Sequence, residues 1–384
     1  MIAGNCHLCG AELFPESILQ LEGMPKAAQY YPLAEELSTD TGITLNIHQC
    51  SGCGLVQLNS APVDYFKEVI TVATLSEKAR QSRLIQMKEL VDKFSLQGKK
   101  VLEVGSGKGE MLDVLEASGM QATGLEASLD SVKIGQSAGR RMVHGYIGDI
   151  CKISGGPFDA FICLNYLEHL PSPGIVIRNI YNNCSANAIG FVTVPNLEYL
   201  LKAKCFYEFV ADHISYFTKQ TLIHTFEGHG FDVLDCLTIN EDNDIAAVVQ
   251  KKKMLNITGQ FCEVEALIDE MRKIVADYKT KNKKVAVWGA GHRTLALISL
   301  GRLTDLAYIV DSAKSKQGKF SPVSHLNIVP PRHLKNESVD LVIVMVPGIY
   351  PDEVLKTIED MDLDVDVAVL RYNKIELIKK RSQE

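Results

Sequence analysis

The sequence predicts an α/β chain with two doubly wound units, preceded by a small module built around four cysteines. Three observations carry this prediction. Two Cys-x-x-Cys pairs lie near the N-terminus, an apolar strand runs into glycines at positions 105, 107 and 109, and a second strand runs into glycines at 289 and 291. Apolar strands that alternate with helices form parallel sheets covered by helices on both faces.

The composition excludes several classes of protein. A chain of 384 residues with 46% hydrophobic content is long enough for two to three domains with full cores. Its net charge of −7 argues against a nucleic-acid surface, which needs a basic face. No apolar run approaches the roughly 20 residues that span a bilayer, and the first ten residues have no signal-peptide pattern. We therefore expect a cytoplasmic protein with no nucleic-acid or membrane partner.

The four N-terminal cysteines are spaced as metal ligands. Cys6 with Cys9, and Cys50 with Cys53, form two Cys-x-x-Cys turns, each followed by glycine. Two such turns give a closed tetrahedral zinc site, whereas a redox dithiol needs only one pair. The insert between them must carry strands of its own, and residues 42–50 alternate as a strand does. The other six cysteines are expected to be small buried hydrophobes: Cys151, Cys163, Cys184, Cys205, Cys236 and Cys262.

A linker and a helix follow the cysteines. Residues 61–75 contain Pro62 and show no strong period, which suits a linker that could also cover a pocket. Ser76 is a good N-cap, and apolar residues then recur at helical spacing. This pattern predicts an amphipathic helix over 77–94.

The central unit begins at Lys100. Strands are expected at 101–104, 122–126, 142–144, 158–164 and 190–195, with helices between them. A helix and strand over 221–239 and a last strand from Asp244 would then close the sheet with a reversed pair. Ligands of such sheets bind at the carboxyl ends of the strands.

Polar residues mark those strand ends. Glycine turns let bare backbone approach a ligand, and Glu103 lies inside the strand before the turn. Glu126 ends the second strand, about 20 residues on, where a carboxylate can accept hydrogen bonds from ribose hydroxyls. Asp149 suits an adenine amino group, and Asn165 ends the fourth strand. These residues indicate a nucleotide-like cofactor, although an NAD-binding unit or a cofactor-free α/β domain would also show part of the pattern.

The last unit repeats the pattern in a reduced form. An amphipathic helix is expected over 261–278, followed by strands at 285–288, 307–310 and 341–346. The glycine turn and Asp311 make a minimal dinucleotide signature, but Thr294 replaces the third glycine. A cofactor-free Rossmann-like domain and a nucleotide-binding one both remain open.

The series of Glu103 with the three glycines, Glu126, Asp149 and Asn165 resembles the class I S-adenosylmethionine (SAM) methyltransferases. The whole chain is similar to one family among them, the sugar C-methyltransferases that act on nucleotide-linked keto-deoxysugars. The segments that carry this resemblance are CSGCGLVQ (50–57), VLEVGSGKG (101–109), DHISYFT (212–218), WGAGHRTLALI (288–298) and the stretch 309–331. It implies a zinc-binding module over 1–64, a linker and helix over 65–98, a methyltransferase domain over 99–255 and a Rossmann-like domain over 256–384.

The resemblance also assigns roles to residues. His213 maps onto the family's general base and His169 onto a second active-site histidine, while Asp212 would orient the loop or fix a tautomer. A histidine of near-neutral pKa can remove a proton next to a carbonyl, so that the enolate attacks the methyl group of SAM. The expected SAM-binding residues are Glu103, Gly105, Ser106, Gly107, Gly109, Glu126, Ala127, Asp149, Ile150 and Asn165. The expected acceptor-binding residues are Tyr65, Tyr166, Tyr207 and Tyr216.

Departures from the family pattern gather on the acceptor side. Asp212 stands where the family has glutamate, and Val210 stands where it has tyrosine. We therefore expect a different keto-sugar or another enolisable small molecule, bound by a monomer or homodimer. An O- or N-methyltransferase on the same scaffold, and a module that binds SAM or a nucleotide without methyl transfer, are the alternatives.

Overall fold

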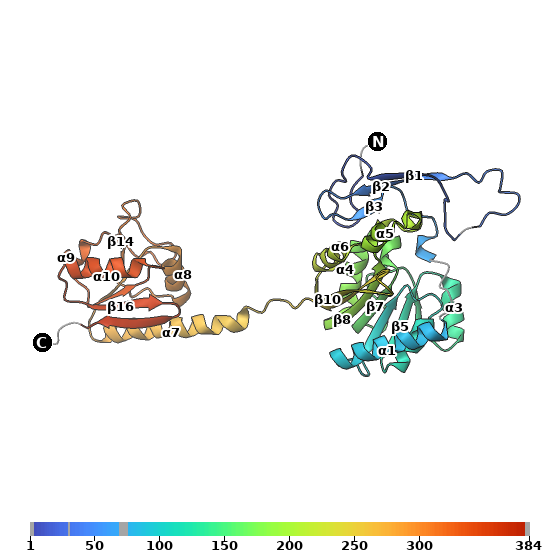
Figure 1. Ribbon diagram of the computed structural model, residues 1–384. Coiled ribbons are helices and arrows are strands. Elements are labelled where there is room, and N and C mark those ends of the chain that lie inside the picture. The colour runs from blue at the N-terminus through green and yellow to red at the C-terminus, as the bar shows by residue number, and fades with distance from the viewer. Residues whose placement is uncertain (1–3, 30, 69–75, 381–384) are drawn as a thin grey trace. The chain divides into compact units, whose positions relative to one another are not determined.

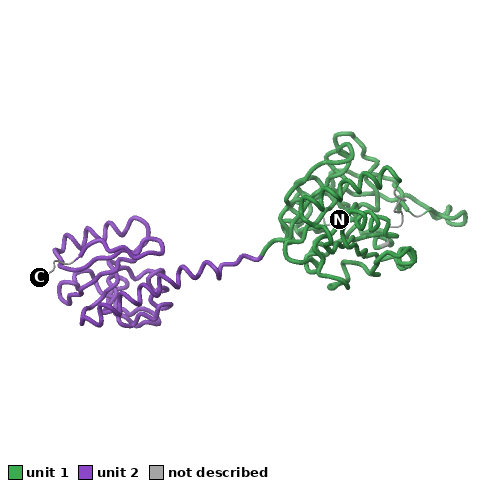
Figure 2. Tube along the Cα trace, turned by 90° about the horizontal axis from the view of Figure 1, so that it is seen from below, with its two compact units in different colours: residues 1–253 green, residues 254–384 purple. Residues whose placement is uncertain are grey.

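The computed structural model describes residues 4–29, 31–68 and 76–380. The chain divides into two compact units, residues 1–253 and 254–384, which are coloured separately in Figure 2. Residues 69–75 of the predicted linker lie outside the described residues. Within the described part, no helix is long and apolar enough to cross a membrane.

The N-terminal part of the first unit is a four-stranded antiparallel sheet, in the order β1-β2-β3-β9. Its strands are β1 (Leu19–Met24), β2 (Ile43–Gln49), β3 (Val56–Leu58) and β9 (Ser215–Tyr216). The strand predicted over 42–50 is confirmed as β2. The fourth strand comes from far along the chain, because Gln57 and Val56 pair with Ser215 and Tyr216. The cysteine module is therefore continuous with the loop that carries His213.

A linking helix then leads into the central sheet. The 3-10 turn η1 (Phe66–Glu68) precedes α1 (Glu77–Phe94), whose N-cap Ser76 accepts a hydrogen bond from the Ala79 N–H at 3.2 Å. Met87, Leu90 and Val91 are the buried face of this helix, which confirms the predicted amphipathic pattern.

The central sheet has seven strands in the order β10-β11-β8-β7-β4-β5-β6. Strands β4 to β8 run parallel, and β11 runs antiparallel to both β8 and β10, as predicted. The strand order reverses between β4 and β7, so the crevice beside their carboxyl ends is the expected ligand site. The strands are β4 (Lys100–Val104), β5 (Gln121–Glu126), β6 (Met142–His144), β7 (Phe158–Leu164), β8 (Cys184–Pro195), β10 (Phe231–Ile239) and β11 (Asp244–Lys251).

Helices cover both faces of this sheet (Figure 1). Side chains alternate across β4, where Leu102 packs in one core cluster and Val101 in another. Phe161 and Ala160 divide in the same way on β7, as the two-residue period of a strand requires. The helical elements are α2 (Glu110–Ala117), α3 (Leu129–Ser137), η2 (Leu167–His169), α4 (Pro173–Asn183), α5 (Leu197–Ala203), η3 (Phe206–Glu208) and α6 (Lys219–Glu227).

The second unit is a smaller doubly wound sheet in the order β14-β13-β12-β15-β16-β17. Its order reverses between β12 and β15, which is again the expected ligand site. The predicted strand over 285–288 is confirmed, and the predicted helix over 261–278 lies within α7. The elements are α7 (Thr258–Thr280), β12 (Val285–Trp288), α8 (His292–Gly301), β13 (Ile309–Val310), β14 (Ile328–Val329), α9 (His333–Asn336), β15 (Leu341–Val344), α10 (Tyr350–Asp360), β16 (Asp366–Arg371) and β17 (Lys374–Lys379).

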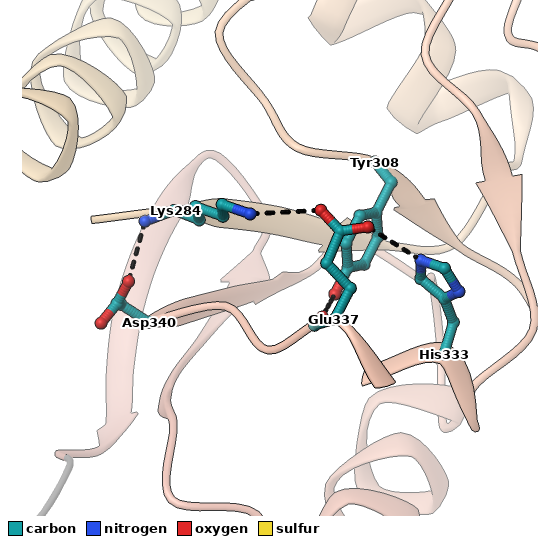
Figure 3. Close-up of polar contacts among 5 residues, drawn as sticks. All are labelled: Lys284, Tyr308, His333, Glu337 and Asp340. Carbon is teal, nitrogen blue, oxygen red and sulfur yellow. Dashed lines mark hydrogen bonds and ion pairs between the residues drawn. The ribbon is translucent and has the colours of Figure 1, made fainter. Parts of the chain in front are cut away.

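A polar network of five residues, shown in Figure 3, lies where β12 and β15 begin. Glu337 forms ion pairs with Lys284 at 3.2 Å and with His333 at 3.3 Å. These contacts, that with Lys284 first, lower the pKa of the Glu337 carboxyl. The Tyr308 hydroxyl donates to the Glu337 carbonyl, and the Lys284 N–H donates to Asp340 at 2.8 Å. The network ties the start of β12 to the segment before β15, which is a structural role.

One sequence expectation about the cysteines is wrong in part. Cys163 and Cys184 are buried, as expected, but Cys151 and Cys262 are exposed and Cys205 and Cys236 are half-buried. A cysteine outside any periodic apolar pattern gives no sequence signal for which face of an element it occupies.

Candidate active site and cysteine cluster

The point between β4 and β7 where the strand order reverses is called the switch point below. The turn after β4 presents backbone rather than side chains to it. Gly105, Gly107 and Gly109 have φ of 72°, 53° and 84°, a region that favours glycine. A Cβ on Gly105 would lie 2.7 Å from the ring of Tyr166, which follows β7. The two strand ends that flank the switch point are therefore in close contact here.

Two polar side chains at this turn each have a buried oxygen atom that lacks a hydrogen-bond partner in the described part of the chain. Glu103 is 5% exposed, and its Oε2 has no hydrogen-bond partner among the described residues, nor has the Ser106 hydroxyl. Burial raises the pKa of Glu103 well above its usual range, and the charge of Glu126 raises it further. A buried carboxyl without a donor is costly, so this arrangement suits a cationic or hydrogen-bonding ligand.

Glu126 ends β5 beside the same turn. Its two oxygens accept hydrogen bonds from the Gly107 N–H at 2.8 Å and the Ser128 N–H at 2.9 Å. These two contacts fix the orientation of the carboxylate at the end of β5.

Asp149 lies in an aromatic and basic setting that the sequence did not indicate. It forms an ion pair with Lys67 of η1 at 2.7 Å, and both side chains are partly exposed. The Lys67 ammonium lies 4.9 Å from the centre of the Tyr146 ring, and Phe66 packs edge-on against that ring at 5.8 Å. An exposed ion pair is weak, so a ligand could compete with Lys67 for Asp149.

The remaining expected SAM-binding residues lie around the strand ends. Asn165 is exposed, with φ of 43°, and its side chain accepts a hydrogen bond from the Thr193 hydroxyl at 2.5 Å. The Ala127 carbonyl contacts the His144 ring at 3.0 Å, and the Ile150 N–H donates to the Tyr146 carbonyl at 3.1 Å.

The two predicted active-site histidines are brought together. His169, on η2, and His213, in the loop before β9, have ring centres 4.7 Å apart in an edge-to-face arrangement. His169 is 6% exposed, whereas His213 is half-buried. Burial lowers the pKa of His213 to about 3, with the charge of His169 as the second cause, and burial also lowers the pKa of His169. Both rings are therefore neutral near pH 7, and their lone pairs are available.

Asp212 orients this pair through its backbone rather than through its carboxylate. Its carbonyl accepts a hydrogen bond at 2.8 Å from Nδ1 of His169, which fixes that tautomer. Its carboxylate accepts hydrogen bonds from the Tyr65 hydroxyl and the Ala28 N–H, each at 2.6 Å. These contacts are consistent with the expected orienting role of Asp212. Through its carboxylate, Tyr65 and Ala28 hold the loop that carries His213.

The four tyrosines expected at the acceptor side lie in different environments. Burial and the Asp212 contact raise the pKa of Tyr65 to about 12. Tyr166 packs on Gly105, and the Tyr216 hydroxyl bonds the Val210 backbone at 3.0 Å, with its ring 6.4 Å from that of His213. Tyr207 is 72% exposed and donates to Cys205. In the described part of the chain, the histidine rings contact each other and Tyr216 but not Tyr207.

Sequence reasoning missed Glu168. It directly precedes His169, is 2% exposed and has a carboxylate oxygen within 4.8 Å of ring nitrogens of both histidines. The signal was present, because an acidic residue next to a histidine just after a parallel strand lies at the ligand edge of the sheet.

The four N-terminal cysteines converge. Their sulfur atoms all lie within 4.8 Å of one another, with Cys6 to Cys53 at 3.6 Å and Cys9 to Cys50 at 3.5 Å. Zinc–sulfur bonds of 2.3 Å in a tetrahedron would separate the sulfurs by about 3.8 Å. Backbone N–H groups of Gly52 and Cys53 also point at the Cys50 sulfur, at 3.3 and 3.4 Å. The donor set and its spacing fit a closed zinc site.

Two family models match the chain. Residues 77–235 match a methyltransferase domain, and residues 247–363 match a C-methyltransferase C-terminal domain. The C-methyltransferase NovU of Streptomyces niveus is 23% identical over an alignment that covers 91% of this chain and 90% of that protein. The ubiquinone biosynthesis O-methyltransferase of Chromobacterium violaceum is 34% identical, but over 22% of this chain and 39% of that protein.

Solved structures are similar to part of the chain. The PH0226 protein from Pyrococcus horikoshii OT3 covers 49% of this chain with 99% of its own, at 15% identity and a TM-score of 0.40. Magnesium protoporphyrin IX methyltransferase from Synechocystis PCC 6803 covers 49% of this chain with 97% of its own, at 15% identity and a TM-score of 0.39.

The strand order with one antiparallel strand inserted beside β8, the glycine turn and the methyltransferase model define the class: the chain is a SAM-dependent methyltransferase. Its second unit matches the C-terminal domain of C-methyltransferases, and the similarity to NovU spans both units. Along both units the chain is thus similar to SAM-dependent C-methyltransferases.

Proposed function

We propose that this enzyme methylates a carbon atom next to a carbonyl group of a nucleotide-linked keto-deoxysugar or a related metabolite, with His213 as general base. One observation carries the proposal. Tyr166 packs on the glycine turn of the switch point, and three residues later His169 contacts His213. Tyr166 and His169 thus link the turn that is expected to bind SAM with the neutral imidazole of His213.

SAM fits the residues at the turn. The Glu103 carboxyl, whose Oε2 has no hydrogen-bond partner among the described residues, would accept hydrogen bonds from the cationic amino group. Glu126 would accept them from the ribose hydroxyls. Asp149 and the Tyr146 ring would contact the adenine. Bound SAM supplies an electrophilic methyl group.

The chain's own residues prepare the acceptor carbon. A neutral His213 accepts the proton from the carbon beside the carbonyl, which leaves the electron pair on the acceptor as an enolate. The ring of His169, which the Asp212 carbonyl holds in place, contacts the ring of His213 and would lie beside the acceptor. Holding the two substrates in contact supplies much of the remaining rate.

The nucleotide part of the acceptor is a proposal from the similarity to NovU and the sugar C-methyltransferases.

Carbon–hydrogen exchange tests the reaction class. With a nucleoside-diphosphate 4-keto-6-deoxyhexose in heavy water and no SAM, we expect deuterium to enter beside the carbonyl. His213→Ala should stop the exchange, while His224→Ala, an exposed histidine on α6, should not. If wild type shows no exchange and His213→Ala keeps full methyl transfer, the enzyme is an O- or N-methyltransferase. If S-adenosylhomocysteine does not bind, the non-catalytic alternative stands.

We also propose that Cys6, Cys9, Cys50 and Cys53 hold one structural zinc ion, which would stabilise the module over 1–64. Metal analysis of purified protein should give about one zinc per chain. Cys9→Ser should lower that content, and the exposed Cys262→Ser should leave it unchanged. Equal zinc contents in the two variants would exclude the site.

A further inference from the structure

Glu168 lies behind the histidine pair in a position that the proposed chemistry has not yet used. Its carboxylate oxygen, one ring nitrogen of His169 and one of His213 all lie within 4.8 Å of one another. The side chain is 2% exposed, and in the described part of the chain its Oε2 has no hydrogen-bond partner. A buried carboxylate oxygen without a hydrogen bond is unfavourable unless the carboxyl is protonated or has a charged partner.

The geometry points these groups at one another. The Asp212 carbonyl holds Nδ1–H of His169, so Nε2 carries the lone pair and lies 4.0 Å from Oε1 of Glu168. The Glu168 carbonyl accepts the Ile214 N–H at 2.9 Å, which fixes η2 to the loop that carries His213. His213 is half-buried, while His169 and Glu168 are buried. An acceptor molecule would therefore meet His213 first, with the carboxylate behind it.

The environment of His213 creates a need for such a partner. Its pKa is lowered to about 3, chiefly by burial, so the isolated ring would hold an abstracted proton weakly. A buried carboxylate beside a histidine base stabilises the imidazolium that forms, as in the serine protease triad.

We propose that Glu168 is the carboxylate partner of His213: it stabilises the imidazolium formed when His213 takes the proton from the acceptor carbon, and then accepts that proton. This inference rests on the proposed function. The carbon–hydrogen bond breaks, its electron pair stays on the acceptor, and the proton passes from His213 to the Glu168 carboxylate and finally to solvent. Glu168 acts through His213 and is therefore a positioning residue.

The surroundings of Glu168 set a pH dependence. Its pKa is raised to about 8, chiefly by burial and less by the charge of Asp244 on β11, while a backbone hydrogen bond opposes the rise. The other titratable groups around it are Cys163 on β7, His169 on η2, Asp212 and His213 in the loop, and Tyr216 on β9. Cys163 and Tyr216 are neutral, because burial raises the pKa of each. Among residues 4–29, 31–68 and 76–380, the ion pair of Glu168 is with His169 and with no lysine or arginine.

The raised pKa of Glu168 determines how activity should change with pH. Below about pH 8 the Glu168 carboxyl carries a proton and cannot accept another, and above it the carboxylate is ready. Methyl transfer should rise with pH through about 8.

A measurement without an acceptor tests the coupling. In the full-length protein with S-adenosylhomocysteine, the ring 15N chemical shifts of His169 and His213 should change with an inflection near pH 8. Glu168→Gln keeps the shape and packing but cannot ionise, so the inflection should vanish, and Glu168→Asp should keep an inflection. Wild-type shifts without an inflection between pH 6 and 10, or an unchanged inflection in Glu168→Gln, would overturn the proposal.

Activity provides the second arm, with the nucleoside-diphosphate 4-keto-6-deoxyhexose as probe. Glu168→Gln should lower kcat about a hundredfold or more, flatten the rise near pH 8 and leave KM for SAM unchanged. A change in KM without a fall in kcat would overturn the role in proton transfer. The same holds if activity requires added Mg²⁺ after treatment with a chelator that leaves the zinc bound. If wild type does not exchange the probe's carbon-bound hydrogen but its histidine shifts inflect near pH 8, the proposed substrate fails and the coupling stands.

Discussion

The two units place an acidic residue in the same position and then treat it differently. Glu126, at the end of β5, accepts N–H groups from Gly107 and Ser128, while Asp311, just after β13, accepts them from Ala290 and Ala313. Each carboxylate is thus held by the preceding glycine turn and by its own loop.

The difference lies in the neighbouring charge. Asp311 also bonds the Lys316 ammonium at 3.0 Å; burial opposes its ionisation, but the Ala313 N–H, Lys316 and the Ala290 N–H outweigh burial and lower its pKa. Beside Glu126 lies another acid, Glu103, whose Oε2 has no hydrogen-bond partner in the described part of the chain. Asp311 is thus paired with a lysine of its own loop, whereas the first turn brings two acids together. We therefore expect the cofactor at the turn after β4 rather than at the turn after β12.

Matched glycine substitutions give the largest expected contrast. Gly105→Ala puts a Cβ at φ of 72° and 2.7 Å from the Tyr166 ring, whereas Gly291→Ala has φ of −93° and no atom within 4 Å. We expect Gly105→Ala to weaken S-adenosylhomocysteine binding about a hundredfold and Gly291→Ala to leave it unchanged, by calorimetric titration. Equal effects would mean that the turn after β4 does not bind the cofactor.

Removing the two carboxylate charges comes next. Glu126→Gln should weaken S-adenosylhomocysteine binding about tenfold, because hydrogen bonds to a charged group contribute about 1.5–3 kcal/mol. Asp311→Asn should leave this affinity as it is. A loss of affinity in Asp311→Asn that matches the Glu126→Gln loss would contradict the assignment of the cofactor to the first unit.

The free energy of unfolding should change in opposite directions in Glu103→Gln and Asp311→Asn. The pKa of Glu103 is raised, so its buried carboxyl destabilises the free enzyme increasingly as pH rises above its usual range. Glu103→Gln should therefore stabilise the first unit by about 1–2 kcal/mol at pH 8. The pKa of Asp311 is lowered, so its contribution is present above the usual range and is lost as pH falls through the folded-state value. Asp311→Asn should destabilise the second unit by a similar amount at pH 7.

Hydrogen exchange read by mass spectrometry separates the two units, because peptides from 100–126 and from 285–311 report on each. Protection that falls in both variants would show that Glu103 already has a partner in solution.

Lys316→Met is the smallest expected effect. The Lys316 side chain is 41% exposed, so its ion pair with Asp311 should contribute no more than about 1 kcal/mol. Thermal unfolding of the second unit should shift by a few degrees at most, and less in high salt. A shift that is large and independent of salt would mean that Lys316 packs rather than pairs.

Local patterns carried most of the fold. The glycine turns, Ser76 as an N-cap and the apolar strands all act within a few residues, so spacing alone placed them. The prediction that His169 and His213 belong to one active site came from a family resemblance. The contact from Tyr65 to Asp212 joins residues 147 apart in sequence, and the pairing of β9 with β3 depends on the same docking. Such contacts leave no period in the sequence, so the backbone role of Asp212 could not be read from it. Glu168 could have been placed at the ligand edge, because it directly precedes His169 just after a parallel strand.

The pairing of β3 with β9 bears on how this enzyme can be re-engineered. Because residues 215–216 supply the last strand of the N-terminal sheet, that sheet is interleaved with the methyltransferase chain rather than placed before it. A chimera that exchanges residues 1–64 alone would join a foreign sheet to a resident edge strand. A productive exchange has to carry the loop of His213 along with the cysteines.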